Sequence, residues 1–333
     1  MSHSKAYRRL VADIDKIDDN TFEPVALEVF RYQASCNPLY KEFIGLIGCE
    51  PEQVGEVTQI PFLPISVFKS YLVQSSKWQP ERIFLSSGTT HETRARHAIR
   101  SMQWYHTLSV RTFEATYGPI RDYAILALLP NYLRQSASSL VEMIAHLIEI
   151  GNSGSSGFYL DDHKKLQRQL SANIDQGQKT ILIGVSYALL DFAMQFPIAL
   201  PAFVTVMETG GMKGRRKEIV REELHNILSE KLKCGPVHSE YGMTELISQA
   251  YSTGSGVFHC APQMRVMIRE ITDPRAWCTK GNTGTVQVVD LGNIDTCSFI
   301  STDDLGRAES DRSFSILGRL DAADIRGCSL LYP

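Results

Sequence analysis

The chain has 333 residues, of which 43% are hydrophobic and 21% are charged, and its formal net charge is −3. This length and composition suit a globular protein built as one large α/β domain or as two lobes. Because 34 Lys and Arg residues face 37 Asp and Glu residues, without a basic arm of interleaved aromatic residues, the sequence argues against nucleic-acid binding.

The sequence shows no pattern that predicts a signal peptide or a membrane-spanning helix. The first residues are charged and lack the apolar stretch of a signal peptide, and no apolar run reaches the roughly 18 residues of a membrane span. The seven cysteines are scattered, odd in number and free of CxxC pairs, which argues against a disulfide framework or a zinc ribbon. We therefore expect a cytoplasmic protein in a reducing compartment.

The predicted elements begin with helices over about residues 4–50, where apolar residues recur at helical spacing. Residues 60–70 contain two prolines in an apolar run and read as an extended connector. Strands and helices then alternate. Strands are predicted near 82–85, 122–130, 180–185, 203–209 and 236–241, and helices near 101–118, 139–150, 186–196, 215–233 and from about 244. Short β segments follow from about 255 onward.

This order of elements predicts an α/β fold. Alternating β and α units indicate a mainly parallel sheet covered by helices, and the last quarter indicates an antiparallel β subdomain. We expect an α/β core with a helical N-terminal segment over 1–255 and a β-rich subdomain over 256–333.

A turn of small polar residues follows the strand near 82–85. The sequence LSSGTT contains Ser86, Ser87, Gly88, Thr89 and Thr90. Backbone N–H groups and hydroxyls in such a turn form a concave site for phosphate oxygens. The chain has no Walker A motif, and an ordinary Ser/Thr turn explains this stretch equally well.

Two further stretches carry candidate nucleotide ligands. In SEYGMTEL (239–246), Tyr241 suits stacking on a purine, Thr244 a phosphate contact and Glu245 a magnesium ion. A helix start with Thr244 as its cap is the alternative. In ISTDDLG (300–306), an aspartate suits the ribose hydroxyls, and an Asp-rich turn is the alternative.

Together these motifs resemble the acyl-adenylate-forming ligase superfamily. LSSGTT, TGGMKG (209–214), SEYGMTEL, TDDLG (302–306) and GRLDAADIRG (318–327) occur in the order of that superfamily, from about residue 80 to the end. The wording of TGGMKG, SEYGMTEL and the terminal RGC is most similar to the LuxE-type acyl-protein synthetases, with the phenylacetate–coenzyme A ligases as the next relatives. The resemblance implies the large N-terminal domain of these enzymes.

The resemblance also implies a reaction and a site. A carboxylic acid, fatty in the LuxE type, is activated by ATP and Mg²⁺ to an acyl-adenylate, and the acyl group passes as a thioester to a protein thiol. Thr244, Glu245 and Arg319 are implied as catalytic residues, with Glu245 also holding the metal. The implied nucleotide-binding residues are Ser86, Ser87, Gly88, Thr89, Thr90, Gly210, Gly211, Tyr241, Gly242, Met243 and Asp304, with Asp303 as the rival of Asp304.

The sequence departs from the superfamily at two places. The phosphate loop continues as HETRAR, so Arg94 or Arg96 has to supply the positive charge that a lysine usually brings. The chain stops at RGCSLLYP, so we expect the mobile C-terminal domain, with its catalytic lysine, to be absent. Cys328 is then the implied acyl carrier, which would pass the acyl group to a partner such as a reductase; a small apolar filler is the alternative reading.

Other functions stay open at this point. An aryl- or acyl-CoA ligase-like enzyme that needs a partner is one, and an inactive nucleotide-binding scaffold is another. A serine acyl hydrolase or transferase is suggested by GVSYA, which places Ser186 between a strand and a helix and would need Glu208 with His238 or His259. His97, beside the phosphate loop, is expected on the surface, with a phosphate contact as the alternative.

Overall fold

A computed structural model describes residues 3–87, 93–130, 137–210 and 219–320 of the chain. It divides into two compact units. The first comprises the described residues of 1–105, 244–248 and 259–333, and the second those of 106–243 and 249–258. Each unit is thus assembled from segments that are distant in the sequence. The boundary expected near residue 255 stays a prediction.

The first unit begins with the expected helices. They are α1 (His3–Asp15), α2 (Phe22–Cys36) and α3 (Pro38–Leu46). The buried Asn37 separates α2 from α3, and its side chain accepts a hydrogen bond from the backbone N–H of Tyr40 while Pro38 opens the new helix. The rings of Phe30 and Tyr40 pack against Phe299 of the sheet. An aromatic core therefore fixes these helices to the unit.

The remaining described elements of the first unit are mainly β strands. Residues 60–70, predicted as an extended connector, form β1 (Leu63–Pro64), which is parallel to β13, and α4 (Val67–Ser70). The strands β2 (Arg82–Leu85) and β3 (Arg96–Ile99) pair as an antiparallel hairpin around the predicted phosphate loop. An antiparallel sheet follows in the order β11 (Met264–Arg269), β12 (Gly284–Asp290), β13 (Phe299–Ser310) and β14 (Ser313–Arg319). The expected antiparallel β segments are thus confirmed.

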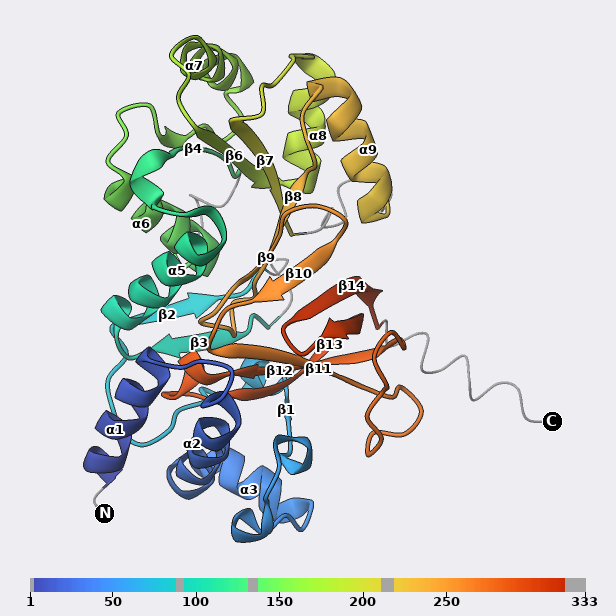
Figure 1. Ribbon diagram of the computed structural model, residues 1–333. Helices are drawn as coiled ribbons and strands as arrows, with labels where there is room; N and C mark the ends of the chain where they lie inside the picture. Colours follow the sequence, from blue (N-terminus) through green and yellow to red (C-terminus); the bar gives the residue numbers. More distant parts are fainter. Residues whose placement is uncertain (1–2, 88–92, 131–136, 211–218, 321–333) are drawn as a thin grey trace, which may run out of the picture. The chain divides into compact units, whose positions relative to one another are not determined.

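The second unit contains the expected parallel sheet. Its strands run in the order β5 (Gly157–Phe158), β4 (Ala124–Leu128), β6 (Thr180–Val185), β7 (Val204–Thr209) and β8 (His238–Tyr241), all parallel, with β9 (Ala250–Ser252) antiparallel to β8. The helices are α5 (Met102–Tyr117), which begins in the first unit, α6 (Ser139–Gly151), α7 (His163–Asp175), α8 (Ser186–Gln195) and α9 (Arg221–Leu232). The last strand, β10 (Val257–Cys260), leads back into the first unit. Figure 1 shows α6 on one side of β4, β6 and β7, and α8 and α9 on the other.

Three expectations about local structure are wrong. The helix predicted over 215–233 begins only at Arg221, so Ile219 and Val220 are not on its apolar face, and Val220 is 70% exposed. No helix follows Glu245, because residues 242–249 lie in turns and irregular structure before β9. The TDD acids are not in a turn: they lie within β13, where Thr302 and Asp304 point inward and Asp303 points to solvent.

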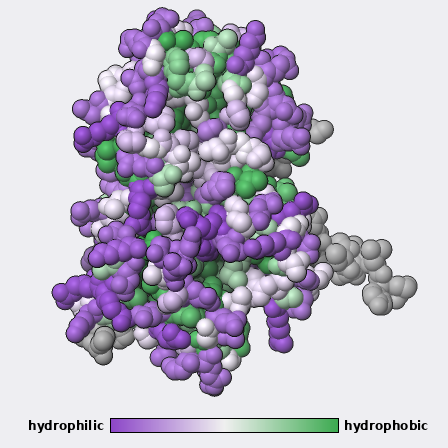
Figure 2. Space-filling model, in the orientation of Figure 1, coloured by the Kyte–Doolittle hydropathy of each residue, from purple (hydrophilic) through white to green (hydrophobic). Residues whose placement is uncertain are grey.

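The surface is mixed in character. The face shown in Figure 2 is mostly hydrophilic, with hydrophobic side chains in scattered patches. Among the described residues, no helix combines the length and the apolar composition that crossing a bilayer requires.

Candidate functional site

The hairpin β2–β3 positions the first candidate residues. The backbone N–H of Ser86 donates to the carbonyl of Ala95 at 3.0 Å, and its hydroxyl accepts from the N–H of Ala95 at 2.9 Å. Ser86 therefore closes the loop between the two strands. Ser87 follows it at an exposed position. Gly88, Thr89 and Thr90 lie outside the described residues.

The motif SEYGMTEL is divided between the two units: residues 239–243 belong to the second unit and 244–248 to the first. The segment 244–248 has no regular secondary structure, so its backbone groups lack the hydrogen bonds of a helix or strand. Buried side chains bind these backbone groups instead. Asn293 donates from Nδ2 to the carbonyl of Glu245 at 2.8 Å. Asp290 accepts from the N–H groups of Ile247 and Ser248, both at 2.8 Å. Thr244 and Glu245 are thereby held in one conformation.

Glu245 is a buried carboxyl group, 7% exposed, among charged neighbours. Burial raises its pKa, the positive charges of Arg319 and Lys69 oppose that rise, and the charge of Asp303 adds to it. A carboxylate oxygen in such a place suits a hard cation that also carries phosphate ligands. No group of three or more His, Cys, Asp or Glu residues in the described parts of the chain could hold a metal ion alone. Glu245 therefore fits Mg²⁺ only as one ligand beside a bound nucleotide.

Asp304 and Arg319 lie opposite each other on β13 and β14. Arg319 donates from Nε to Asp304 Oδ1 at 3.2 Å, with 73% of the arginine side chain and 8% of the aspartate side chain exposed. Asp303 is exposed and its backbone carbonyl accepts from the N–H of Leu320 at 2.7 Å. The two motifs near the chain end thus meet in one strand pair. Arg319 and Asp303 of this pair are among the charges that act on Glu245.

In the second unit, the strand end of β8 carries Tyr241, which is 7% exposed and has its ring 5.7 Å from that of Phe258. Gly242 follows, and a Cβ there would collide with the carboxylate of Glu240. Met243 is half-buried. Gly210 follows β7 with φ of +69°, a conformation that glycine adopts without strain. Gly211 lies outside the described residues.

Two buried glutamates occupy neighbouring strands of this unit. Burial opposes ionisation of Glu208, but hydrogen bonding with His225 and the charge of Arg221 lower its pKa overall. Burial raises the pKa of Glu240 to about 7, although a hydrogen bond from Thr209 opposes the rise. Glu208 is therefore the anion of the pair, and Glu240 exchanges its proton near neutrality.

The geometry around Ser186 lacks the parts of a hydrolase. Its hydroxyl lies 2.5 Å from the carbonyl of Gly210 and 3.2 Å from Glu208, both acceptors. Ser186 is not among the described residues with positive φ, whereas the serine of a nucleophile elbow sits on a strained turn. His238 interacts with Tyr117 at 3.1 Å and not with this serine.

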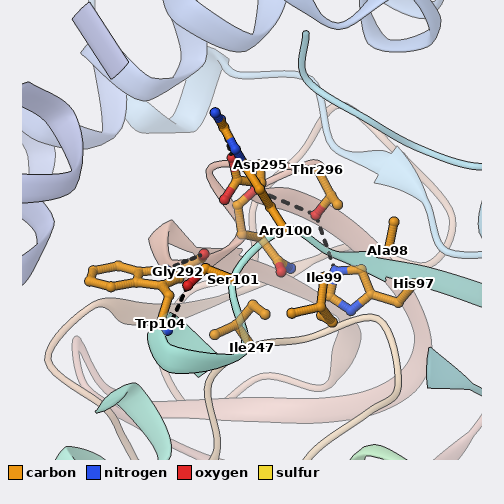
Figure 3. A pocket seen from close by; sticks show the side chains of 11 residues that line it. His97, Ala98, Ile99, Arg100, Ser101, Trp104, Ile247, Gly292, Asp295 and Thr296 are labelled. Atoms are coloured by element: carbon orange, nitrogen blue, oxygen red, sulfur yellow. Dashed lines mark hydrogen bonds and ion pairs between the residues drawn. The ribbon is translucent and has the colours of Figure 1, made fainter. Parts of the chain in front are cut away.

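His97 is placed differently from the expectation. It is 1% exposed, so the prediction of a surface histidine is wrong. Nδ1 lies 2.7 Å from the carbonyl oxygen of Thr244, and Nε2 lies 3.2 Å from the hydroxyl of Thr296. Burial lowers its pKa to about 4, although the contacts with Thr244 and Asn293 favour the charged form. Figure 3 shows the ring facing Thr296 in a small recess of the first unit.

Sequence reasoning singled out His97 only as a surface histidine or a phosphate contact, and it missed the other residues that hold and surround the motifs. His97, Asp290 and Asn293 are buried partners of 244–248, and Lys69 is an exposed lysine whose charge acts on Glu245. None lies in a recognisable motif. The one signal is the run of polar residues that begins at Asp290, the last residue of the apolar strand β12. The predicted Arg94 and Arg96 flank the end of the phosphate loop, and Cys328 lies outside the described residues.

Comparison with known families shows which family the chain belongs to. The family described as acyl-protein synthetase, LuxE, matches residues 7–332. This chain belongs to the LuxE acyl-protein synthetase family. The match confirms the resemblance to the LuxE type that the motifs predicted. The comparison with curated proteins finds no match.

Solved structures agree on the fold of this LuxE family member. The 2-hydroxyisobutyryl-CoA ligase in complex with 2-HIB-AMP aligns with a TM-score of 0.65 and 10% identity, covering 91% of this chain and 69% of that one. ATP-bound MatB from Rhodopseudomonas palustris aligns with a TM-score of 0.54 and 17% identity, covering 73% and 49%. MenE from Bacillus subtilis, with ATP and magnesium, aligns with a TM-score of 0.50 and 16% identity, covering 71% and 49%. The chain thus spans about half the length of the MatB and MenE chains.

Proposed function

We propose that this protein activates a carboxylic acid, with a fatty acid as the first candidate, by means of ATP and Mg²⁺ and then transfers the acyl group to a protein thiol. The observation that carries the proposal is the placement of Glu245. It is a buried carboxyl group on a segment fixed by side chains, and the charges of Arg319 and Lys69 act on it. A site of this kind suits a polyphosphate with its metal ion.

The first step follows from charge. One oxygen of the acid attacks the α-phosphorus of ATP, the bond to the bridging oxygen breaks, and pyrophosphate leaves with the electron pair. Because the attacking carboxylate is already an anion, no general base is required. The barrier is the crowding of negative charge, which oriented donors and cations relieve. We assign Thr244 to the α-phosphate, Arg319 to the nucleotide and Asp304 to the ribose, with Asp303 as the rival for that role.

Bound Mg²⁺ would neutralise part of the phosphate charge, and Glu245 is the residue we assign to it. We assign the loop of Ser86, Ser87, Gly88, Thr89 and Thr90 to the phosphates. The glycines Gly210, Gly211 and Gly242, together with Tyr241 and Met243, are assigned to the nucleotide side of the second unit.

The acceptor of the acyl group is the second part of the proposal. Burial raises the pKa of each of the six described cysteines: Cys36, Cys49, Cys234, Cys260, Cys278 and Cys297. A thiol attacks as its thiolate, so none of these six is activated. We therefore propose Cys328 as the acceptor within this chain: its thiolate attacks the acyl carbon of the adenylate, the bond from that carbon to the phosphate oxygen breaks, and AMP leaves. A reductase or carrier protein would be the next acceptor. Transfer to coenzyme A with the help of a partner is the second candidate.

The test is ATP–pyrophosphate exchange measured with a panel of fatty and aryl acids. We expect exchange that depends on one class of acid and that falls at least about 100-fold in Glu245→Ala, in line with the loss of one transition-state contact of about 3 kcal/mol. Ser186→Ala serves as the control for the hydrolase reading. ATP-independent ester cleavage that is lost in Ser186→Ala, without exchange by the unmodified protein, would replace the proposal.

A further inference from the structure

The segment 244–248 must be held in place by groups outside it. It carries Thr244 and Glu245, yet it has neither a helix nor a strand to hold it, and its chain neighbours on both sides belong to the other unit. Buried side chains of the first unit take over this task. Asp290 binds the N–H groups of Ile247 and Ser248, and Asn293 binds the carbonyl of Glu245. Among the described contacts, a single side chain, His97, binds the carbonyl of Thr244.

The partners of His97 fix its protonation state. A carbonyl oxygen only accepts hydrogen bonds, so Nδ1 must carry the proton that points to Thr244. Nε2 faces the hydroxyl of Thr296, which can donate to it. Burial keeps the ring neutral. The described surroundings therefore select the Nδ1–H tautomer, in which the ring donates to Thr244 and leaves Nε2 as an acceptor facing Thr296.

The position of His97 in the fold decides which elements its hydrogen bond to Thr244 connects. His97 lies on β3, directly after the loop that Ser86 and Ala95 close, and it pairs with Phe84 on β2. The edge of its ring is packed against the ring of Phe68, 5.9 Å away between centroids, in the same short helix as Lys69. One rigid side chain thus connects the hairpin β2–β3 with the segment of Thr244 and Glu245.

We propose that His97 is a positioning residue for adenylation. Its neutral Nδ1–H tautomer fixes the Thr244 carbonyl, and this sets the position of the Thr244 hydroxyl and the Glu245 carboxylate relative to the hairpin β2–β3. The proposal rests on the proposed function. A misplacement of about 1 Å at such a site costs about 100-fold in rate, whereas binding of ATP depends on many other contacts. The role therefore predicts a loss in kcat with little change in KM.

Two substitutions separate positioning from packing. In His97→Asn, the amide nitrogen occupies nearly the place of Nδ1 and can still donate to Thr244. In His97→Gln, the amide lies nearer the place of Nε2 and loses that bond. We expect His97→Asn to keep kcat for pyrophosphate exchange within about 5-fold, and His97→Gln to lose about 100-fold, with KM for ATP within about 3-fold in both.

A matched control measures the cost of losing any buried hydrogen bond. Tyr40→Phe removes the bond from a fully buried hydroxyl to the carbonyl of Pro61, which does not contact 244–248. We expect it to lower thermal stability, as His97→Gln does, while leaving kcat unchanged. Equal kcat losses in His97→Asn and His97→Gln, or a His97→Gln enzyme with unchanged kcat, would overturn the proposal.

A second readout does not require turnover. Nitrogen NMR of the histidine ring in the unmodified protein should show a protonated Nδ1 and an unprotonated Nε2 between pH 6 and 8. A ring that carries its proton on Nε2 would also overturn the proposal. If the unmodified protein shows the expected tautomer but exchanges no pyrophosphate with any acid, the proposed function fails instead.

Discussion

At the scale of the residue, two glutamates on adjacent strands have opposite ionisation. Glu208 and Glu240 lie at the ends of β7 and β8, and both are buried. Glu208 has a guanidinium, Arg221, 2.9 Å away, whereas Glu240 accepts a hydrogen bond from the hydroxyl of Thr209. A neutral partner stabilises a buried anion less than a cation does, so Glu240 keeps its proton up to a higher pH than Glu208 does.

This difference predicts how stability changes with pH. The pKa of Glu240 rises from its ordinary value of 4.5 to about 7 in the fold, so folding favours its protonated form. That contribution is complete below pH 4.5 and is lost as the pH rises to about 7. We expect Glu240→Gln to match the unmodified protein at pH 4.5 and to be up to about 3 kcal/mol more stable at pH 8. Urea unfolding across this range measures the difference, and a variant that is less stable at pH 8 would refute the assignment.

The sequence predicted individual candidates better than their surroundings. Thr244 and Glu245 were found because their motif is contiguous, and the structure places them on one fixed segment. His97 was expected at the surface because it has no metal-ligand spacing to other histidines, and an exposed position is the default for such a polar residue. Its burial depends on β3 lying against residues 244 and 296, which are far away in the sequence, and no local pattern reports such a contact.

At the scale of the element, the close spacing of the strand pair β13–β14 leaves no room for a side chain at Gly306. Gly306 lies in β13 next to a register shift, and a Cβ on it would be 2.5 Å from the carbonyl oxygen of Ser315 and 2.8 Å from Val286. A backbone carbonyl cannot move aside as the end of a side chain can. Because this strand pair also carries Asp304 and Arg319, its spacing also bears on the candidate site.

We expect Gly306→Ala to reduce the free energy of unfolding by about 1–3 kcal/mol, the usual cost of forcing an extra carbon into a packed region. The control is Gly318→Ala in β14, where a Cβ would meet no atom within 4 Å. It should change stability by less than about 0.5 kcal/mol. Denaturant titrations of both variants decide the matter, and equal effects would show that strand spacing does not govern this site.

Element types were largely predictable, and element ends were not. The strands β4, β6 and β7 and the helices after them follow from apolar runs and helical periodicity. The absence of a helix after Glu245 does not. Locally, Thr244 and Glu245 are a good helix start, but the tertiary contacts of Asp290 and Asn293 with the backbone hold this segment in an irregular conformation. Tertiary contacts outweigh local propensity where a site has to be shaped.

At the scale of the whole molecule, the cysteines give a chain-wide comparison. Six of the seven are described, and all six are free thiols whose pKa burial raises. Cys260 and Cys297 are the extreme cases, with pKa values of about 12. A thiol that is almost wholly protonated at pH 7 attacks an acyl-adenylate slowly. Any acylation of this chain at a cysteine should therefore concentrate at Cys328.

This argument can be tested with a radiolabelled or alkyne-bearing acid, ATP and Mg²⁺. We expect one acyl group per chain, removed by neutral hydroxylamine as a thioester is, and absent from Cys328→Ala. Pyrophosphate exchange should persist in that variant, because forming the adenylate does not need the thiol. Cys278→Ala is the matched control, since Cys278 is a half-buried thiol whose loss should leave labelling intact. Labelling that survives in Cys328→Ala but disappears in Cys278→Ala would move the acceptor into the described fold. No labelling in any variant, with exchange intact, would place the acceptor thiol on another molecule.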